Sequence, residues 1–224
     1  MSDSTARTNH ERLLEFLQPV PVIPVITIRR LEDAIPLAEA LVAGGIRYLE
    51  ITLRSPIARK AAETIARNVP QAIVGIGTVL TPQDLVDAAN IGAQFALSPG
   101  ATQKLLEAAS DSPLPFIPGV TTASEIMAAE EYGFFLLKFF PASALGGKAA
   151  LRAFQGPFPD VVFCPTGGIT AENFLEWRAL PNVVTVGGSW LTPETLIDDH
   201  NWPAITHLAR NALAALNSVQ AVLF

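Results

Sequence analysis

The sequence predicts a single α/β domain over residues 1–224, a (β/α)₈ TIM barrel with an extra N-terminal helix. Short apolar runs rich in Val, Ile and Phe alternate with longer segments of helical periodicity, which is typical of βαβ units around a parallel sheet. Eight such runs are present, and barrels of this kind commonly exceed about 200 residues as one unit. Half of the residues are hydrophobic (50%) and only 16% are charged, as expected for a large buried interior.

The predicted strands are too short and too apolar to be surface helices. Both faces of a parallel strand in such a fold are covered, so continuous apolar runs are expected instead of alternation. In chain order the predicted strands are Val22–Ile28, Tyr48–Thr52, Ile73–Val79, Phe95–Pro99, Pro115–Val120, Phe135–Phe140, Val161–Gly167 and Val183–Gly188.

Predicted helices occupy the intervals between these strands. Several begin at a residue that can cap a helix, since Thr81 precedes Pro82 and Thr122 stands three residues before Glu125. Gly133 follows a predicted helix end, where the left-handed conformation is common. The predicted helices are Leu31–Ala43, Pro56–Asn68, Pro82–Ile91, Thr102–Ala109, Ala123–Tyr132, Lys148–Phe154, Ala171–Leu180 and Trp202–Asn217, with the extra helix at Arg7–Leu17 expected to lie at the bottom of the barrel.

Charge and residue usage exclude several classes of protein. The 15 basic and 21 acidic residues give a net charge of −6 without any stripe of Lys and Arg, so a nucleic-acid partner is not expected. The single Cys164 leaves no internal disulfide and no cysteine cage for a metal. The N-terminus lacks the apolar region of a secretory signal, and no apolar run reaches the roughly 18 residues of a membrane helix. We therefore expect a soluble, cytoplasmic protein.

Lys138 is an unusual residue because it lies inside a predicted strand among large apolar side chains. Burying an ammonium group is costly, and one relief is a neutral, nucleophilic amine of the kind that Schiff-base enzymes need. The remaining lysines, Lys60, Lys104 and Lys148, lie in predicted helices, where a solvated charge is sufficient explanation. The alternative for Lys138 is a purely structural pair with a carboxylate.

Glu50 lies near the end of the second predicted strand and is a candidate for proton transfer. An ordinary ion pair with Arg54, four residues later, is the alternative. Because the carboxyl ends of barrel strands meet at one mouth, Glu50 and Lys138 are expected to come together there. Thr78 follows Gly75-Ile76-Gly77 near the end of the third predicted strand, and its hydroxyl can bind one oxygen of a substrate carboxylate while Arg54 supplies the charge. The Gly75-Ile76-Gly77 motif lacks the third glycine of a dinucleotide-binding fingerprint, so a nicotinamide cofactor is not indicated.

Paired glycines end the last two predicted strands. They let backbone N–H groups approach an anion, and many such barrels hold a substrate phosphate after strands seven and eight. Tight turns without a ligand are the alternative. Pro99 and Phe140 end two further strands and complete the candidate substrate-binding residues. The candidates for phosphate binding are Thr166, Gly167, Gly168, Gly187, Gly188 and Ser189.

Together these motifs resemble the family of 2-keto-3-deoxy-6-phosphogluconate (KDPG) aldolases, which is also associated with cleavage of 4-hydroxy-2-oxoglutarate (KHG). The resemblance spans about Pro21 to Leu191. It is carried by Pro-Val-Ile-Pro-Val at 21–25, Leu-Glu-Ile-Thr-Leu-Arg at 49–54, Gly-Ile-Gly-Thr-Val-Leu at 75–80, Ala-Leu-Ser-Pro-Gly at 96–100, Phe-Ile-Pro-Gly-Val at 116–120, Lys-Phe-Phe-Pro-Ala at 138–142, Cys-Pro-Thr-Gly-Gly-Ile at 164–169 and Gly-Gly-Ser-Trp-Leu at 187–191.

The resemblance implies that Lys138 forms the Schiff base, that Glu50 transfers protons and that Arg54 and Thr78 hold the pyruvate carboxylate. It also implies the phosphate site at the glycine pairs, a cytoplasmic homotrimer and a place in the Entner–Doudoroff pathway. The products of cleavage are then pyruvate and D-glyceraldehyde 3-phosphate, with no metal or organic cofactor. One departure is Ser143, where many relatives carry an acidic residue.

Other functions remain open at this point. One is an aldolase for the galactonate-derived epimer, 2-dehydro-3-deoxy-6-phosphogalactonate, or mainly for KHG. Another is a phosphate-binding barrel isomerase that uses Glu50 as a base without covalent chemistry, and a third is a non-catalytic oligomer. The three histidines, His10, His200 and His207, lie near the termini, so neither a histidine-bound zinc nor a Ser-His-Asp triad is expected.

Overall fold

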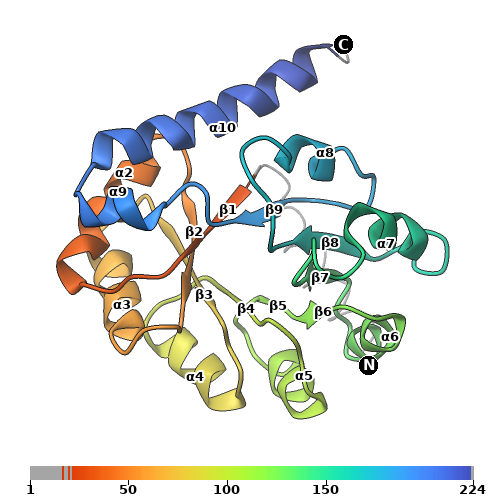
Figure 1. Ribbon diagram of the computed structural model, residues 1–224. Coiled ribbons are helices and arrows are strands. Elements are labelled where there is room, and N and C mark those ends of the chain that lie inside the picture. The colour runs from red at the N-terminus through yellow and green to blue at the C-terminus, as the bar shows by residue number, and fades with distance from the viewer. Residues whose placement is uncertain (1–16, 18–19, 21, 223–224) are drawn as a thin grey trace.

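The computed structural model describes residues 17, 20 and 22–222, in which parallel strands curl around a common interior (Figure 1). Each strand lies within one of the predicted apolar runs. The strands are β1 (Val22–Ile26), β2 (Tyr48–Thr52), β3 (Ile73–Gly77), β4 (Phe95–Leu97), β5 (Phe116–Ile117), β6 (Gly119–Val120), β7 (Leu136–Phe139), β8 (Val162–Pro165) and β9 (Val186–Gly188).

The described strands form two parallel sheets. A six-stranded sheet has the order β5-β4-β3-β2-β1-β9, and a three-stranded sheet has the order β6-β7-β8. Pro118 separates β5 from β6, and its carbonyl accepts a hydrogen bond of 2.8 Å from the Lys138 N–H. Isolated parallel bridges, one of them between Thr166 and Gly187, connect β8 to the segment around β9. The predicted α/β fold with a parallel sheet is confirmed, whereas complete closure into an eight-stranded barrel stays a prediction.

Helices follow the strands and cover the outer faces of the sheets (Figure 1). No helix in the described residues is both long and apolar enough to cross a membrane. The extra helix predicted at Arg7–Leu17 lies outside the described residues, apart from the buried Leu17. The helical elements are η1 (Leu31–Asp33, a 3₁₀ turn), α2 (Ala34–Ala43), α3 (Ala58–Asn68), α4 (Pro82–Asn90), α5 (Gln103–Ser110), α6 (Ala123–Glu131), α7 (Gly147–Phe154), α8 (Phe174–Arg178), α9 (Glu194–Asp198) and α10 (Trp202–Val222).

Hydrogen bonds to side chains explain where two of these helices begin. At α4 the Thr81 hydroxyl accepts from the Asp84 N–H at 3.1 Å, and the Asp84 carboxylate accepts from the Thr81 N–H at 3.0 Å. The predicted start of α8 at Ala171 is wrong. The Thr170 N–H donates instead to the Asn173 side chain at 2.9 Å, and the helix begins only after this turn.

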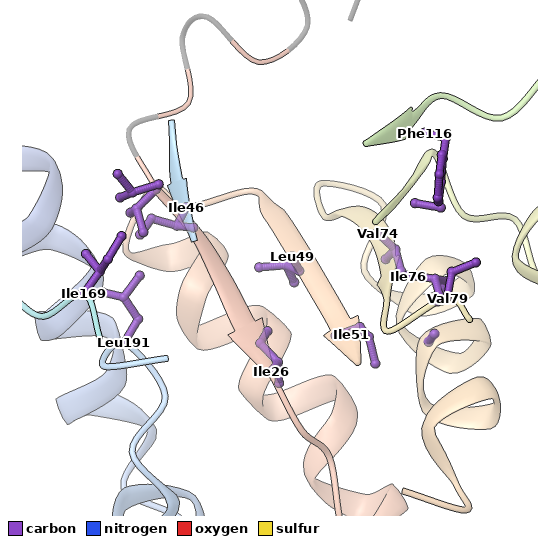
Figure 2. Close-up of a cluster of buried hydrophobic side chains, with 14 of the residues drawn as sticks. Ile26, Ile46, Leu49, Ile51, Val74, Ile76, Val79, Phe116, Ile169 and Leu191 are labelled. Atoms are coloured by element: carbon purple, nitrogen blue, oxygen red, sulfur yellow. The ribbon is translucent and has the colours of Figure 1, made fainter. Parts of the chain in front are cut away.

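Two apolar layers hold the strands in place. The outer layer lies between strands and helices and includes Leu49 and Ile51 of β2 (Figure 2). The inner layer lies inside the curled sheets, where Leu97 and Cys164 are both fully buried. Because successive side chains of a strand point to opposite faces, each strand contributes to both layers. A polar side chain that points inward from one strand therefore lies in this inner layer, where it can contact polar side chains that point inward from other strands.

Candidate functional site

Glu50 and Lys138 both face the interior that the strands enclose. In β2 the neighbours Leu49 and Ile51 belong to the outer layer, so the alternation of the strand turns Glu50 inward. In β7 the same alternation turns Lys138 inward, since Leu136 belongs to the inner layer. The predicted meeting of the two charged side chains at one site is therefore what the described residues show.

The two side chains form a direct, buried ion pair. Lys138 Nζ donates to Glu50 Oε1 at 2.8 Å, and the side chains are only 3% and 1% exposed. The second carboxylate oxygen, Oε2, is buried and has no hydrogen-bond partner among the described residues. A Cβ atom at Gly77 would lie 2.1 Å from Oε1, so β3 passes directly against the carboxylate and only glycine fits there. The Phe140 ring flanks the amine, with its centre 5.7 Å from Nζ.

This geometry suits covalent catalysis by an amine. A carboxylate at hydrogen-bond distance can accept a proton from the ammonium group and leave a neutral nucleophile. The oxygen without a partner can then bind a water molecule or a substrate hydroxyl. A buried ion pair of this kind is a weak source of stability, so stability alone does not account for its presence in the interior.

Arg54 and Thr78 lie in the loops after β2 and β3, and Thr78 directly follows Gly77, which lies against the Glu50 carboxylate. Arg54 Nε donates to Thr78 Oγ1 at 3.2 Å. Thr78 has a φ of 62°, a left-handed conformation that is rare for a β-branched residue. Backbone hydrogen bonds on both sides, from Leu53 to Gly77 at 2.9 Å and from Val79 to Leu97 at 3.1 Å, hold the chain there. Such strain is common at functional sites, and here it directs a hydroxyl toward a guanidinium group.

The two glycine pairs come together as predicted. The bridge between Thr166 and Gly187 joins the loops after β8 and β9. A Cβ atom at Gly187 would lie 2.2 Å from Thr166 Oγ1, so the strands approach each other more closely than another residue would allow. Gly167 and Gly168 have φ values of 100° and 74°, which favour glycine. Ser189, the residue after Gly188, is exposed.

Further polar groups line the same end of the strands and were missed by the sequence analysis. Thr52 is fully buried two residues beyond Glu50, on the same face of β2, and donates to the Ile26 carbonyl at 2.9 Å. Its oxygen lies 2.9 Å from the hydroxyl of Thr27. The signal that could have found Thr52 is its spacing of two from Glu50.

Pro99 and Phe140, the remaining candidates, are both half-buried. Pro99 packs closely against β6, because a Cβ atom at Gly119 would lie 2.3 Å from the Pro99 carbonyl carbon. Ser98, which the sequence analysis did not single out, accepts from the Gly119 N–H at 3.1 Å. The loop after β4 is thereby tied to the strand that pairs with β7.

Cys164 lies opposite Lys138 in the pairing of β7 with β8. It is fully buried, and this burial raises the pKa of the thiol to about 12. The thiol therefore stays protonated near neutral pH and behaves as a small apolar side chain.

Comparison with known proteins gives a consistent result. The family model for KDPG and KHG aldolase matches residues 13–208. The KHG/KDPG aldolase of Escherichia coli (strain K12) is 52% identical over 193 residues, which cover 86% of this chain and 91% of that protein. A solved structure of KDPG aldolase from Legionella pneumophila, with pyruvate captured at low pH as a covalent carbinolamine, matches with a TM-score of 0.84 and 53% identity, over 86% of this chain and 93% of that chain. The KDPG aldolase of Zymomonas mobilis ZM4 with 3-phosphoglycerate matches with a TM-score of 0.82 and 40% identity, over 89% and 94% of the two chains.

Proposed function

The chain belongs to the KDPG and KHG aldolase family, and we propose that it is a class I aldolase that cleaves 2-dehydro-3-deoxy-6-phosphogluconate to pyruvate and D-glyceraldehyde 3-phosphate, the cleavage step of the Entner–Doudoroff pathway. The observation that carries the proposal is the buried hydrogen bond of 2.8 Å between Lys138 and Glu50. The covalent pyruvate in the Legionella pneumophila structure supports the Schiff-base step. The name of the Escherichia coli relative supports KHG as a further substrate.

The reaction begins when Glu50 accepts a proton from Lys138 and the neutral amine attacks the C2 ketone. The carbinolamine loses water with proton transfer through Glu50, and the protonated imine becomes an electron sink. Removal of the C4 hydroxyl proton by Glu50, directly or through a bound water, breaks the C3–C4 bond and releases the aldehyde. The enamine then takes a proton at C3, and hydrolysis of the imine releases pyruvate and restores Lys138. The imine itself accepts the electrons, so the scheme needs no metal or organic cofactor.

Two groups of residues position the substrate in this scheme. Arg54 and Thr78 bind the carboxylate next to the ketone, and Pro99 and Phe140 flank the carbon chain. The phosphate group lies at the other end, where backbone N–H groups approach it closely. The 3-phosphoglycerate in the Zymomonas mobilis structure supports a phosphorylated ligand for this family. The phosphate-binding residues are Thr166, Gly167, Gly168, Gly187, Gly188 and Ser189.

The finer points of architecture belong to the same proposal. With β5 and β6 counted as one strand, the described residues form eight strand segments, and the Lys138–Pro118 hydrogen bond and the bridges between β8 and β9 support a closed (β/α)₈ barrel. The protein acts in the cytoplasm as a homotrimer of one-domain subunits.

The covalent step is tested by trapping. Borohydride added together with pyruvate reduces the imine, so we expect peptide mass spectrometry to find a three-carbon label on Lys138. The peptides that contain Lys60, Lys104 and Lys148 serve as internal controls and stay unlabelled. Inactivation with no label on Lys138 would contradict the mechanism and favour an isomerase without covalent chemistry.

The choice of substrate is tested by the rate of pyruvate release. We expect release to be faster from the gluconate-derived phosphate than from its C4 epimer, with KHG as a slower third substrate. A faster reaction of the galactonate-derived epimer would reassign the preferred configuration at C4 of the substrate and leave the Schiff-base mechanism unchanged. No pyruvate from any of the three would overturn the proposed function.

A further inference from the structure

Successive carbonyl groups in the loop after β8 are tied to the loop after β7. The Thr166 carbonyl accepts from the Ala142 N–H at 2.8 Å, and the Gly167 carbonyl accepts from the Ser143 N–H at 3.0 Å. The Gly168 carbonyl accepts from two side chains, Ser143 Oγ at 3.1 Å and Asn173 Nδ2 at 3.2 Å. Ser143 therefore holds two adjacent peptide groups, one through its backbone and one through its hydroxyl.

The orientation of these carbonyls determines where the neighbouring N–H groups point. In a trans peptide the N–H points away from the C=O of the same peptide group. The N–H groups of Gly168 and Ile169 are therefore turned away from Ser143, and neither donates to another residue in the described part of the chain. Two adjacent, unpaired N–H groups make a concave donor site for an anion.

Glycine alone does not keep such a site in place. Gly167 and Gly168 have positive φ values, and residues without Cβ rotate between peptide orientations at low cost. A rotated peptide would direct a carbonyl oxygen toward the anion in place of an N–H. The Ser143 side chain packs directly against Gly168, since a Cβ atom there would lie 2.4 Å from Ser143 Oγ.

We propose that Ser143 and Asn173 are positioning residues for the substrate phosphate, because they hold the Gly167 and Gly168 carbonyls away from it and direct the N–H groups of Gly168 and Ile169 toward it. This inference rests on the proposed function for the identity of the phosphorylated substrate. Neither side chain is required at the ketone, where Lys138 reacts. Their contribution is therefore confined to substrates that carry a phosphate.

The test compares substrates with and without phosphate. One neutral hydrogen bond contributes about 1 kcal/mol, so Ser143→Ala is expected to raise KM for the phosphorylated substrate about fivefold and to weaken inhibition by inorganic phosphate by the same factor. The kinetics with KHG, which carries no phosphate, stay unchanged. Ser143→Thr, which keeps the hydroxyl, restores most of the loss. Asn173→Ala is the second variant and follows the same pattern.

Ser110→Ala is the matched control, because Ser110 also donates from its hydroxyl to a backbone carbonyl, that of Glu107 at 2.8 Å, but in α5. Its KM for both substrates stays at the wild-type value. The proposal is overturned if Ser143→Ala and Asn173→Ala leave phosphate inhibition unchanged, or if they impair KHG cleavage as strongly as cleavage of the phosphorylated substrate. Failure of the proposed function looks different, since the wild-type protein then forms no borohydride adduct with pyruvate. Calorimetric titration of wild type and Ser143→Ala with inorganic phosphate still decides the positioning role in that case.

Discussion

Lys138 and Glu50 depend on each other for stability, because they form a buried ion pair. Removing one partner of a buried ion pair leaves an uncompensated charge and costs about 3–5 kcal/mol, whereas replacing both can be neutral. We therefore expect Lys138→Met to lower the free energy of unfolding by about 3 kcal/mol. The double variant Lys138→Met/Glu50→Gln should recover most of this loss, because its buried side chains carry no charge.

Urea unfolding of the two single variants and the double variant at neutral pH measures this coupling. Glu50→Gln is the replacement closest in size. Size matters here because the β3 backbone at Gly77 lies directly against the Glu50 carboxylate. If the losses of the two single variants simply add in the double variant, the two side chains do not stabilise each other.

The sequence indicates some residues of the site much more clearly than others. Lys138 and Glu50 stand out because a charged side chain inside an apolar strand has few structural explanations. Thr52 and Ser143 do not stand out, because a hydroxyl at the end of a strand suits solvent and interior equally well. Their roles depend on which carbonyl each hydroxyl meets, and that is determined by neighbouring loops that are distant in sequence.

At the scale of an element, the start of α6 depends on one carboxylate. Glu125 accepts from the N–H and hydroxyl groups of Thr121, both at 2.7 Å, and from those of Thr122 at 2.8 and 3.0 Å. Partial burial raises its pKa, but the hydrogen bonds from Thr121 and Thr122 outweigh this and hold the pKa below its ordinary value.

Acid is therefore expected to weaken this helix start. Since the pKa of Glu125 is lower in the folded than in the unfolded protein, its stabilisation is complete above the unfolded value of about 4.5 and is lost as pH falls through the folded value. Glu125→Gln should lower stability at pH 7 and remove this part of the acid dependence. Urea midpoints from pH 7 to pH 3 measure both effects, and parallel curves for variant and wild type would contradict the assignment.

The boundaries of elements were predicted less well than their existence. The run Pro115–Val120 was predicted as one strand, yet Pro118 offers no N–H to the ladder and divides it into β5 and β6. The five-residue helix α9 was not predicted, because so short a segment shows no helical period. In both cases the neighbouring strands and loops, more than the local pattern, determine the observed bounds.

At the scale of the whole molecule, α10 packs across α2 at Gly44 (Figure 1). A Cβ atom there would lie 2.4 Å from Ala209 Cβ and 2.8 Å from the Thr206 carbonyl oxygen. Gly44→Ala would ordinarily stabilise by reducing the entropy of the unfolded chain, by about 0.4–1 kcal/mol. Here we expect overpacking to prevail and to destabilise by about 1–3 kcal/mol.

Thermal and urea unfolding measure the change at Gly44. Gly156→Ala is the control, since a Cβ atom at Gly156 meets nothing within 4 Å and its φ is not positive. The control should be neutral or slightly stabilising. A Gly44→Ala protein as stable as wild type would show that α10 moves aside without cost.

The overall architecture follows from the alternation of strands and helices, which predicts the parallel order of neighbouring strands. Closure of the sheet is less predictable, because it depends on hydrogen bonds between segments that no local pattern relates. Around β8 and β9 it rests on isolated bridges such as Phe163–Val183. Side-chain composition gives no signal for such single contacts.

The contacts between α2 or its neighbouring loop and the segments around α9 and α10 also constrain the order in which the protein can fold during synthesis. The Thr206 hydroxyl donates to the Ala40 carbonyl 166 positions away, and Arg30 donates to the Ile197 carbonyl 167 positions away. The ribosome must therefore release the chain as far as α10 before α10 can pack against α2. Contacts of such long separation slow folding, and the nascent chain carries an uncovered apolar helix face until α10 has been synthesised.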